Sequence, residues 1–150
     1  MLTQEMYRDI IENQIPIAWA AGVRMESFGL DETKIYVELD RMNQNPFKSM
    51  FWAVQGMAAE FAGGLMVNVK ARMTGKDISM LVVAQESVFT KKALGKITFT
   101  CSDGGLIDDK IKAALATGEG QTMVLTSTGV DEQGDQVAQF KFTWSVKAKN

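Results

Sequence analysis

One glutamate stands in the most apolar stretch of the chain, where a charged side chain is least expected. From Met50 to Val67 the sequence reads MFWAVQGMAAEFAGGLMV, and Glu60 is its only charged residue. Burial among apolar side chains disfavours the charged form of a carboxyl group, so we expect a raised pKa. A carboxyl group with a raised pKa suits a general base or a proton-sharing group. The alternative is that Glu60 faces a solvent gap or pairs with Arg24, Arg72 or a lysine of a neighbouring strand.

The residue types that are missing restrict the chemistry further. The chain has 150 residues, no histidine and a single cysteine, Cys101. These counts exclude Ser-His-Asp and Cys-His catalysis, histidine-ligated zinc, a zinc ribbon and an intramolecular disulfide. A net charge of −2 and a pI near 5.2 disfavour a nucleic-acid partner. Cys101 falls on a predicted strand, where we expect it to be buried and inert, and the lack of disulfides favours a cytoplasmic location.

The apolar stretch 50–69 is long enough to be mistaken for a membrane span. Gln55, Glu60 and Asn68 interrupt it, so we expect no span and instead a helix buried on all sides inside a soluble core. Charged residues within the first dozen positions also argue against a signal-peptide core.

Hydrophobic periodicity and breaker residues predict an α+β chain that forms a single domain over residues 1–150. The expected helices are residues 2–13, 15–21, 49–71 and 106–117, and the expected strands are residues 23–30, 34–39, 78–89, 96–102, 121–130 and 137–146. Asp103 is a candidate N-cap of the last helix, and Gly22 and Gly118 are expected to end the helices before them. Residues 1–21 then form a helical extension, whose first helix has an apolar stripe of Leu2, Met6, Ile10 and Ile11. Short connections between successive strands favour an antiparallel sheet, which we expect to wrap around the apolar helix.

The segment from Asn45 to Glu60, NPFKSMFWAVQGMAAE, resembles the signature of hotdog-fold thioesterases. That signature has an asparagine in a loop, a helix start with small residues, and an acid fifteen residues after the asparagine, which is the separation of Asn45 and Glu60. The resemblance is strongest to the PaaI-like acyl-CoA thioesterases and their YiiD-like relatives. Residues 89–95, FTKKALG, also resemble the aromatic and basic turn between two strands of that family.

The resemblance implies a hotdog fold, in which an antiparallel sheet wraps a long helix and two subunits join to form a homodimer or a dimer of dimers (a homotetramer). Two active sites would lie at the dimer interface and hydrolyse an acyl-CoA, with no cofactor beyond the coenzyme A thioester substrate itself. Glu60 would act as base or nucleophile. The backbone amide of Trp52, eight residues earlier, would stabilise the oxyanion, since a helix N-terminus offers free N–H donors.

Five further residues are candidates for the site, and each has a plainer alternative role. Asn45 would position the catalytic loop or simply form an Asx turn. Ser49 would cap the helix or hold the attacking water. Lys48 would meet a phosphate or carboxylate or be a solvated surface lysine. Lys91 and Lys92 would bind the phosphates of coenzyme A or belong to an ordinary solvated turn.

The sequence departs from the family pattern at three places. Pro46 replaces a histidine, Lys48 replaces a small loop residue, and Phe51 and Trp52 stand where glycine is usual. Bulky side chains at the helix start could reshape or block the substrate pocket. The alternative function is therefore a non-catalytic hotdog module that binds an acyl or lipid-like ligand, with Phe51 and Trp52 filling the mouth. A hydratase or dehydratase is disfavoured because that chemistry in hotdog enzymes uses a histidine.

Overall fold

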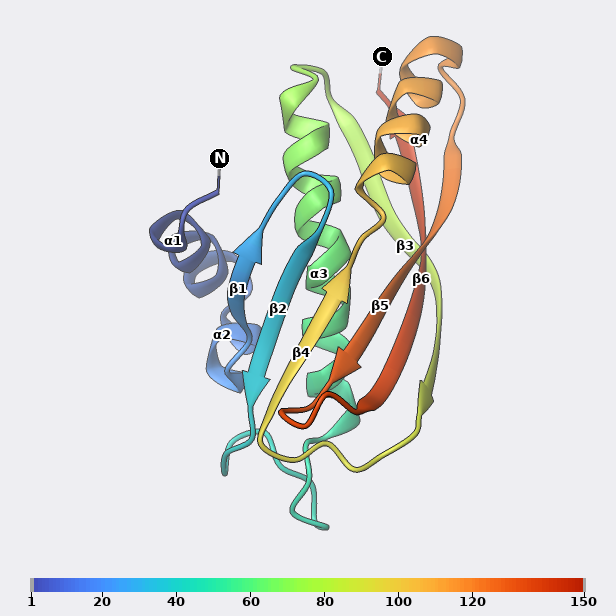
Figure 1. The fold of residues 1–150 in the computed structure, drawn as a ribbon. Helices are drawn as coiled ribbons and strands as arrows, with labels where there is room; N and C mark the ends of the chain where they lie inside the picture. The colour runs from blue at the N-terminus through green and yellow to red at the C-terminus, as the bar shows by residue number, and fades with distance from the viewer. Residues whose placement is uncertain (1, 150) are drawn as a thin grey trace.

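The computed structural model describes residues 2–149, and in it a six-stranded sheet curves around one long helix (Figure 1). The helices are α1 (Gln4–Gln14), α2 (Pro16–Ala21), α3 (Trp52–Met73) and α4 (Gly104–Thr117). The strands are β1 (Arg24–Phe28), β2 (Thr33–Glu38), β3 (Ile78–Phe89), β4 (Lys96–Cys101), β5 (Gln121–Val130) and β6 (Gln136–Ala148). Their order is β1-β2-β4-β5-β6-β3, and all neighbours are antiparallel. The α+β hotdog fold predicted from the sequence is confirmed.

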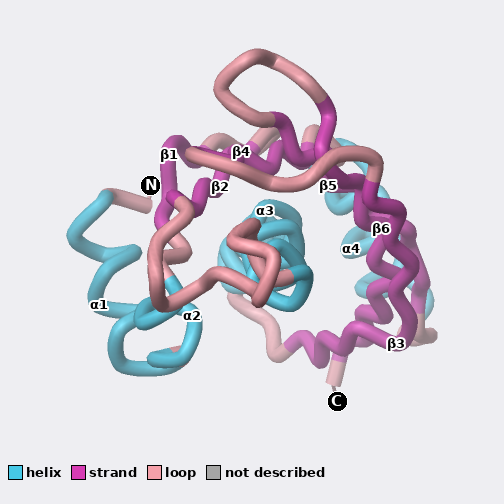
Figure 2. The backbone as a smooth tube through the Cα atoms, turned by 90° about the horizontal axis from the view of Figure 1, so that it is seen from below, coloured by secondary structure: helices cyan, strands magenta, loops and turns pink. Residues whose placement is uncertain are grey.

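Helix α3 is the central element, and the sheet curves around it in the view along its axis (Figure 2). It has 22 residues and follows Phe51, whose extended backbone ends the preceding loop. The helix therefore begins three residues later than predicted, at Trp52 rather than Ser49. Lys70 and Arg72 stand in its last turn, where positive charge is favourable. Within residues 2–149 no helix is long and apolar enough to cross a membrane.

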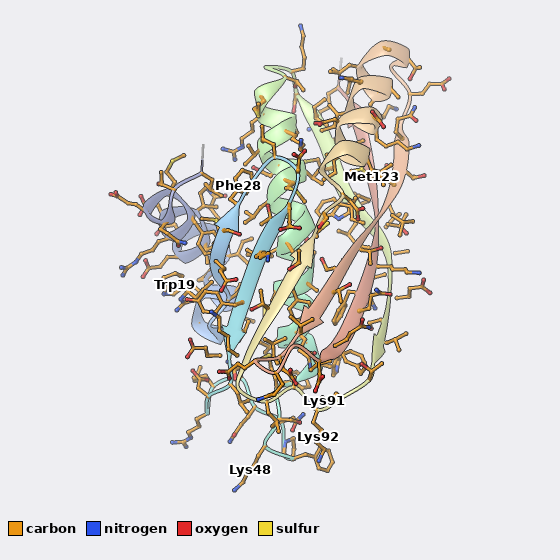
Figure 3. All side chains as sticks on the ribbon, in the orientation of Figure 1. Trp19, Phe28, Lys48, Lys91, Lys92 and Met123 are labelled. Atoms are coloured by element: carbon orange, nitrogen blue, oxygen red, sulfur yellow. The ribbon has the colours of Figure 1, made fainter. Side chains whose placement is uncertain are left out.

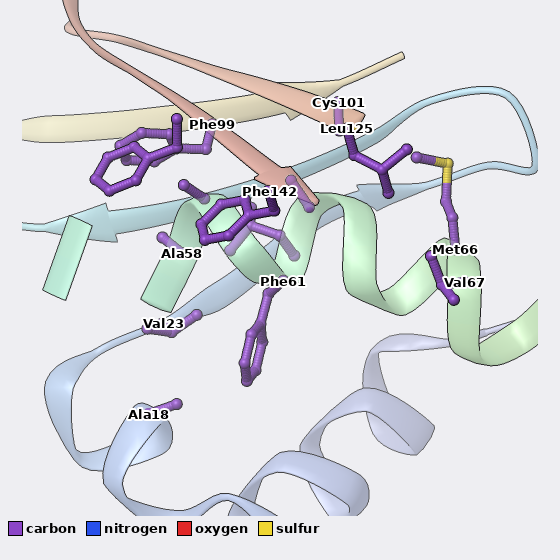
Figure 4. Packing of buried hydrophobic residues seen from close by; sticks show 14 of the residues in the cluster. Ala18, Val23, Ala58, Phe61, Met66, Val67, Phe99, Cys101, Leu125 and Phe142 are labelled. Atoms are coloured by element: carbon purple, nitrogen blue, oxygen red, sulfur yellow. The ribbon is translucent and has the colours of Figure 1, made fainter. Parts of the chain in front are cut away.

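Small residues let the sheet approach α3 closely. A Cβ atom on Gly63 would lie only 3.0 Å from Leu125 Cδ1, so a side chain here would push the Leu125 methyl group aside. Figure 4 shows Leu125 and Phe142 reaching toward α3 from the sheet, whereas Phe61 points toward the N-terminal helices. Cys101 is buried in this core, as predicted, and burial raises the pKa of its thiol to about 12, which disfavours the reactive thiolate.

The N-terminal extension covers one edge of the sheet. Figure 1 shows α1 and α2 beside β1, the first edge strand. The Gln4 side chain donates to the carbonyl of Met25 at 2.7 Å, and the Tyr7 hydroxyl donates to the carbonyl of Val23 at 3.0 Å. Gly22, with φ of 96°, ends α2 and lets the chain turn into the sheet. Side chains of α1 thus fix the extension to β1.

The buried face of α1 differs from the apolar stripe seen in the sequence. Tyr7 and Ile11 are the residues of this helix that are fully buried, whereas Met6 is exposed. Leu2 and Ile10 are only half-buried. The stripe is therefore divided between the core and a more open region beside α3.

Helix α4 packs against β5, β6 and the end of α3. The buried amine of Lys70 pairs with Asp108 of α4 at 2.8 Å. Asp103 occupies the predicted cap position, but its carboxylate accepts from the backbone N–H of Thr126 at 2.8 Å instead of capping the helix. Gly118 ends α4 with φ of 70°, as predicted.

The other edge of the sheet, β3, is paired with β6 on one side only. Its Leu81, Val83 and Val88 side chains are each more than half exposed. A long edge strand with exposed apolar side chains is a ready surface for pairing with another chain. The two sheet edges are therefore unlike, since the extension covers β1 and no element within residues 2–149 pairs with the outer edge of β3.

Candidate active site

The sheet leaves one side of α3 uncovered between α2 and β3 (Figure 2). Ala53, Met57, Glu60, Gly64 and Asn68 are spaced three or four residues apart and are all half-buried. This spacing places them on one stripe of the helix. Glu60 therefore lies on a side of α3 that is covered only in part, whereas most of the helix is buried.

A cavity of about 190 Å³, which we call the acid cavity, opens beside Glu60 between α1 and α3. The Glu60 carboxyl makes no hydrogen bond or ion pair with any residue of the 2–149 range, and burial raises its pKa, as predicted. Arg72 lines the same cavity without pairing with Glu60, and Arg24 instead stacks on the Trp19 ring at 3.5 Å. The ion-pair alternative is therefore not the arrangement found.

Gly64 allows an indole ring to lie close to the Glu60 carboxyl. A Cβ atom on Gly64 would lie 3.2 Å from Trp144 Cζ2 and 3.7 Å from Glu60 Oε1. Trp144 also lines the acid cavity, and its buried indole N–H has no acceptor within the described part of the chain. The Glu60 carboxyl group and the Trp144 ring thus border one small cavity, while the indole nitrogen itself is covered by the protein. Sequence reasoning missed Trp144, because nothing in the spacing of β6 links it to α3.

A second cavity, of about 560 Å³, lies at the N-terminal end of α3 and is called the loop cavity here. Residues 45–47 and 49–52 form its walls, together with Gln55, the end of β3 and the turn after it. Asn45 Oδ1 accepts from the backbone N–H groups of Phe47 at 2.9 Å and Ser49 at 3.2 Å. The Asx turn considered for Asn45 is confirmed, and the same bonds hold Ser49 in the loop. The expectation that Ser49 caps α3 is wrong, because Phe51 occupies the cap position.

The first turn of α3 has free backbone donors beside the loop cavity. The Phe51 N–H donates to the Asn43 carbonyl at 2.9 Å, but the N–H groups of Trp52 and Ala53 have no acceptor within residues 2–149. The Phe51 and Trp52 rings line the cavity in an edge-to-face pair, and 45% and 53% of these residues remain exposed. Free donors at a helix N-terminus suit a developing negative charge.

Gln55 lines the loop cavity and carries a buried acceptor. The residue is only 4% exposed, its Nε2 donates to the Met50 carbonyl at 3.3 Å, and its Oε1 has no partner within the described residues. A buried acceptor without a donor is costly unless a ligand or water satisfies it. Sequence reasoning noted Gln55 as a polar exception in the apolar stretch but gave it no role.

The three candidate lysines lie at the same end of the molecule (Figure 3) but differ in their surroundings. Lys91 bonds the carboxylates of Asp131 at 2.6 Å and Asp135 at 2.8 Å, so two acids already neutralise its charge. Lys92 lies 5.8 Å from the centre of the Phe47 ring and lines the loop cavity. Lys48 is exposed outside that cavity.

Glu60 and the Trp52 amide do not border a common cavity within one chain. Eight residues separate them, which is about 12 Å along a helix. Asn45, Ser49, Phe51, Lys91 and Lys92 line the loop cavity together with Trp52. One chain therefore offers a carboxyl group in one place and free N–H donors with a nearby cation in another.

Metal binding has no visible basis in the arrangement of side chains. Within residues 2–149 no three histidine, cysteine, aspartate or glutamate residues are grouped so that they could hold a metal ion.

A match over residues 3–146 shows that the chain belongs to the family described as "Domain of unknown function (DUF4442)". Among curated proteins, no sequence matches the chain significantly. Solved structures share its hotdog fold, and several of them are called thioesterases.

Three of these structures illustrate the likeness. A Pseudomonas aeruginosa protein of unknown function, called a probable thioesterase, is 22% identical with a TM-score of 0.82, covering 99% of this chain and 97% of its own. A Haemophilus influenzae thioesterase is 16% identical with a TM-score of 0.74, covering 99% and 92%. A Staphylococcus aureus thioesterase with a glutamine-to-alanine substitution is 14% identical with a TM-score of 0.66, covering 88% and 98%. At these identities the likeness establishes the fold.

Proposed function

We propose that the protein is an acyl thioesterase that hydrolyses an acyl-CoA or a similar thioester, with Glu60 as general base. The observation that carries this proposal is the Glu60 carboxyl, which is unpaired, has a raised pKa and stands beside an apolar cavity. Glu60 would take a proton from water while the water oxygen attacks the acyl carbon. The tetrahedral intermediate would then break its C–S bond, and the proton would pass to the departing thiolate. This sequence consumes only water and needs no cofactor.

We further propose that the active site is shared between two copies of the chain. An oxyanion needs N–H donors about 3 Å away, and the donors nearest the helix start open into a different cavity from Glu60. A second chain paired along the outer edge of β3 would bring its own Trp52 amide toward Glu60 of the first. The exposed apolar side chains of that edge support such pairing, as a homodimer or a dimer of dimers.

The remaining candidates take supporting roles in this proposal. The Asn45 side chain holds the loop that presents the donors, and Ser49 either completes that loop or holds water. The Phe51 ring borders the entrance for the thiol arm. Lys92 and Lys48 would meet the phosphates of coenzyme A, whereas Lys91 chiefly holds the β5–β6 hairpin through its two acids.

The spacing of substitutions in related folds also supports the proposal. Structures of the S. aureus protein carry alanine in place of one glutamine or one glutamate, and these two positions are fifteen apart. Asn45 and Glu60 have the same separation.

The test is a thiol-release assay on acyl-CoAs from short-chain to long-chain and aryl, with Glu60→Gln beside the parent. General-base catalysis contributes about 10²- to 10⁴-fold, so kcat should fall by that factor in Glu60→Gln. Glu119→Gln, an exposed glutamate outside both cavities, is the matched control and should behave like the parent. Equal activity of Glu60→Gln and parent would overturn the proposal. Ligand binding without any turnover would instead support the non-catalytic acyl-binding module.

A further inference from the structure

We propose that the acid cavity holds the apolar tail of the acyl group, and that the N-terminal helix α1 sets the chain length that the protein accepts. This inference rests on the proposed thioesterase function and deepens it by naming the substrate class. Its basis is the composition, size and polar border of the cavity between α1 and α3.

The walls of the acid cavity are mostly hydrocarbon. The α1 side is formed by Leu2, Ile10, Ile11 and Ile15, and the α3 side includes Phe61, Leu65 and Val69. Side chains of this kind favour an apolar occupant, because each buried methylene gains about 0.8 kcal/mol, or about fourfold in affinity. Gln14, Asn68 and Arg72 also line the cavity, so the apolar tail would occupy the part that these aliphatic and aromatic side chains form.

The volume of the cavity limits the length of the tail. An apolar protein cavity of about 150 Å³ holds one benzene molecule. By proportion, the acid cavity of about 190 Å³ holds about seven or eight carbon atoms. The structure thus favours a medium-length acyl chain or a single aromatic ring over a long-chain fatty acyl group.

The polar border of the cavity distinguishes an acyl group from a plain hydrocarbon. The Glu60 carboxyl and the Trp144 indole both lie against Gly64, and the indole N–H has no acceptor within the described residues. A buried water needs two to four polar partners, and the Glu60 carboxyl supplies one acceptor at this border. An acyl group would place its thioester carbonyl beside that carboxyl and its tail against the apolar walls.

Helix α1 is a fixed wall rather than a loosely attached segment. Ile11 is fully buried, and Gln4 and Tyr7 bond backbone carbonyls at β1. Ile10, by contrast, is half-buried and faces the cavity without being part of the core. Changing Ile10 therefore changes the depth of the cavity at small cost to the fold.

The experiment compares Ile10→Trp, which fills the cavity, with Ile10→Ala, which enlarges it. Ile17→Ala is the matched control, since Ile17 lies on the same extension, is 69% exposed and does not line the cavity. The readouts are kcat/KM for acyl-CoAs of two to sixteen carbons and calorimetric affinity for S-octyl coenzyme A, a thioether that cannot be hydrolysed. A thermal unfolding transition shows whether each variant is folded. If Ile10→Trp does not fold, Ile10→Ala still tests the proposal.

We expect Ile10→Trp to lower both kcat/KM for octanoyl-CoA and affinity for the thioether about tenfold, the loss of nearly two methylenes. Acetyl-CoA turnover should stay within about twofold of the parent, because its tail does not reach α1. In Ile10→Ala the preferred chain should be longer, and Ile17→Ala should match the parent.

Three results would contradict the tail site, the thioesterase function or both, and the experiment distinguishes them. Ile10 variants that keep the parent's chain-length profile and thioether affinity, while Glu60→Gln still abolishes turnover, overturn the tail site and leave the thioesterase standing. A parent that hydrolyses no acyl-CoA but binds the thioether in an Ile10-dependent way supports the tail site and overturns the thioesterase. Neither turnover nor Ile10-dependent binding overturns both.

Discussion

The acid cavity and the loop cavity lie along the same helix but differ in nearly every property. The acid cavity is small, about 190 Å³, has mostly apolar walls and holds one unpaired carboxyl group. The loop cavity is larger, about 560 Å³, and is lined by Trp52 with its free N–H, by Gln55 and by Lys92. The acid cavity suits a hydrocarbon tail next to a general base. The loop cavity suits a polar arm and a developing negative charge. An acyl-CoA has both kinds of chemistry on the two sides of its thioester carbonyl.

The difference also shows why one chain should not suffice. The base and the oxyanion donors are about two helical turns apart on α3 and open into separate cavities. In the proposed dimer, pairing along the outer edge of β3 would bring the acid cavity of one copy to the loop cavity of the other. We therefore expect Glu60 of one copy and the Trp52 amide of the other to act on the same substrate.

At the loop cavity, the largest expected effect comes from removing a single backbone donor. Trp52→Pro deletes the N–H at the first helical position, where proline is well tolerated and where this donor has no partner within residues 2–149. Phe51 already has the extended conformation (ψ 133°) that precedes a proline comfortably. Loss of one oxyanion donor should lower kcat about 10²- to 10³-fold. Trp52→Ala, which keeps the N–H and loses the ring, should lose far less.

Mixing two inactive variants tests the shared site directly. Random pairing of Trp52→Pro with Glu60→Gln makes half of the dimers mixed, and each mixed dimer has one site with both functional groups intact. A shared site therefore predicts recovery of about a quarter of the parent activity in the thiol-release assay. No recovery, with mixed dimers demonstrated by mass spectrometry, would place both groups in one chain and contradict the composite site.

A smaller effect is expected at the orphaned acceptor of the loop cavity. Gln55→Leu removes an Oε1 that has no donor within the described residues, so the folded state should be about as stable as the parent. If Oε1 accepts from an amide N–H of the pantetheine arm, kcat/KM for octanoyl-CoA should fall about three- to tenfold.

The thiol side of the substrate supplies the control for Gln55. The S-ethyl ester of octanoic acid has no amide, so its hydrolysis should be unchanged by Gln55→Leu. Equal losses of kcat/KM on both substrates would show that Gln55 shapes the start of α3 and does not bind the thiol arm.

Local sequence was sufficient to predict the helices, the strands and the buried position of Glu60, but not the two cavities. The apolar residues around Glu60 predicted both the buried helix and the raised pKa of the Glu60 carboxyl. Gly22 and Gly118 marked the ends of two helices correctly. The helix start was predicted three residues too early, because the bonds from Asn45 to Ser49 extend the loop in a way that residue type alone does not reveal.

The acid cavity depends on contacts between segments far apart in the sequence. Ile10 and Trp144 meet Glu60 only because α1 packs beside α3 and β6 passes behind it. Periodicity identifies a face of each element, but it does not state which faces meet. Lys91 shows the same limit, since its two acidic partners lie forty or more positions away.

The smallest expected effect concerns stability at the acid cavity, where function and folding are opposed. Because burial raises the pKa of Glu60 in the folded state, folding favours its protonated form. This contribution is complete below the pKa of the unfolded chain and is lost as pH rises through the folded pKa. Glu60→Gln should therefore raise Tm at pH 8, by about 2–4 °C for each kcal/mol gained, and the gain should shrink toward pH 4. Differential scanning calorimetry of Glu60→Gln and Glu119→Gln at both pH values measures this. A gain that is the same at pH 4 and pH 8 would mean that the Glu60 carboxyl is well solvated, and the acid cavity would then resemble the loop cavity more than its walls indicate.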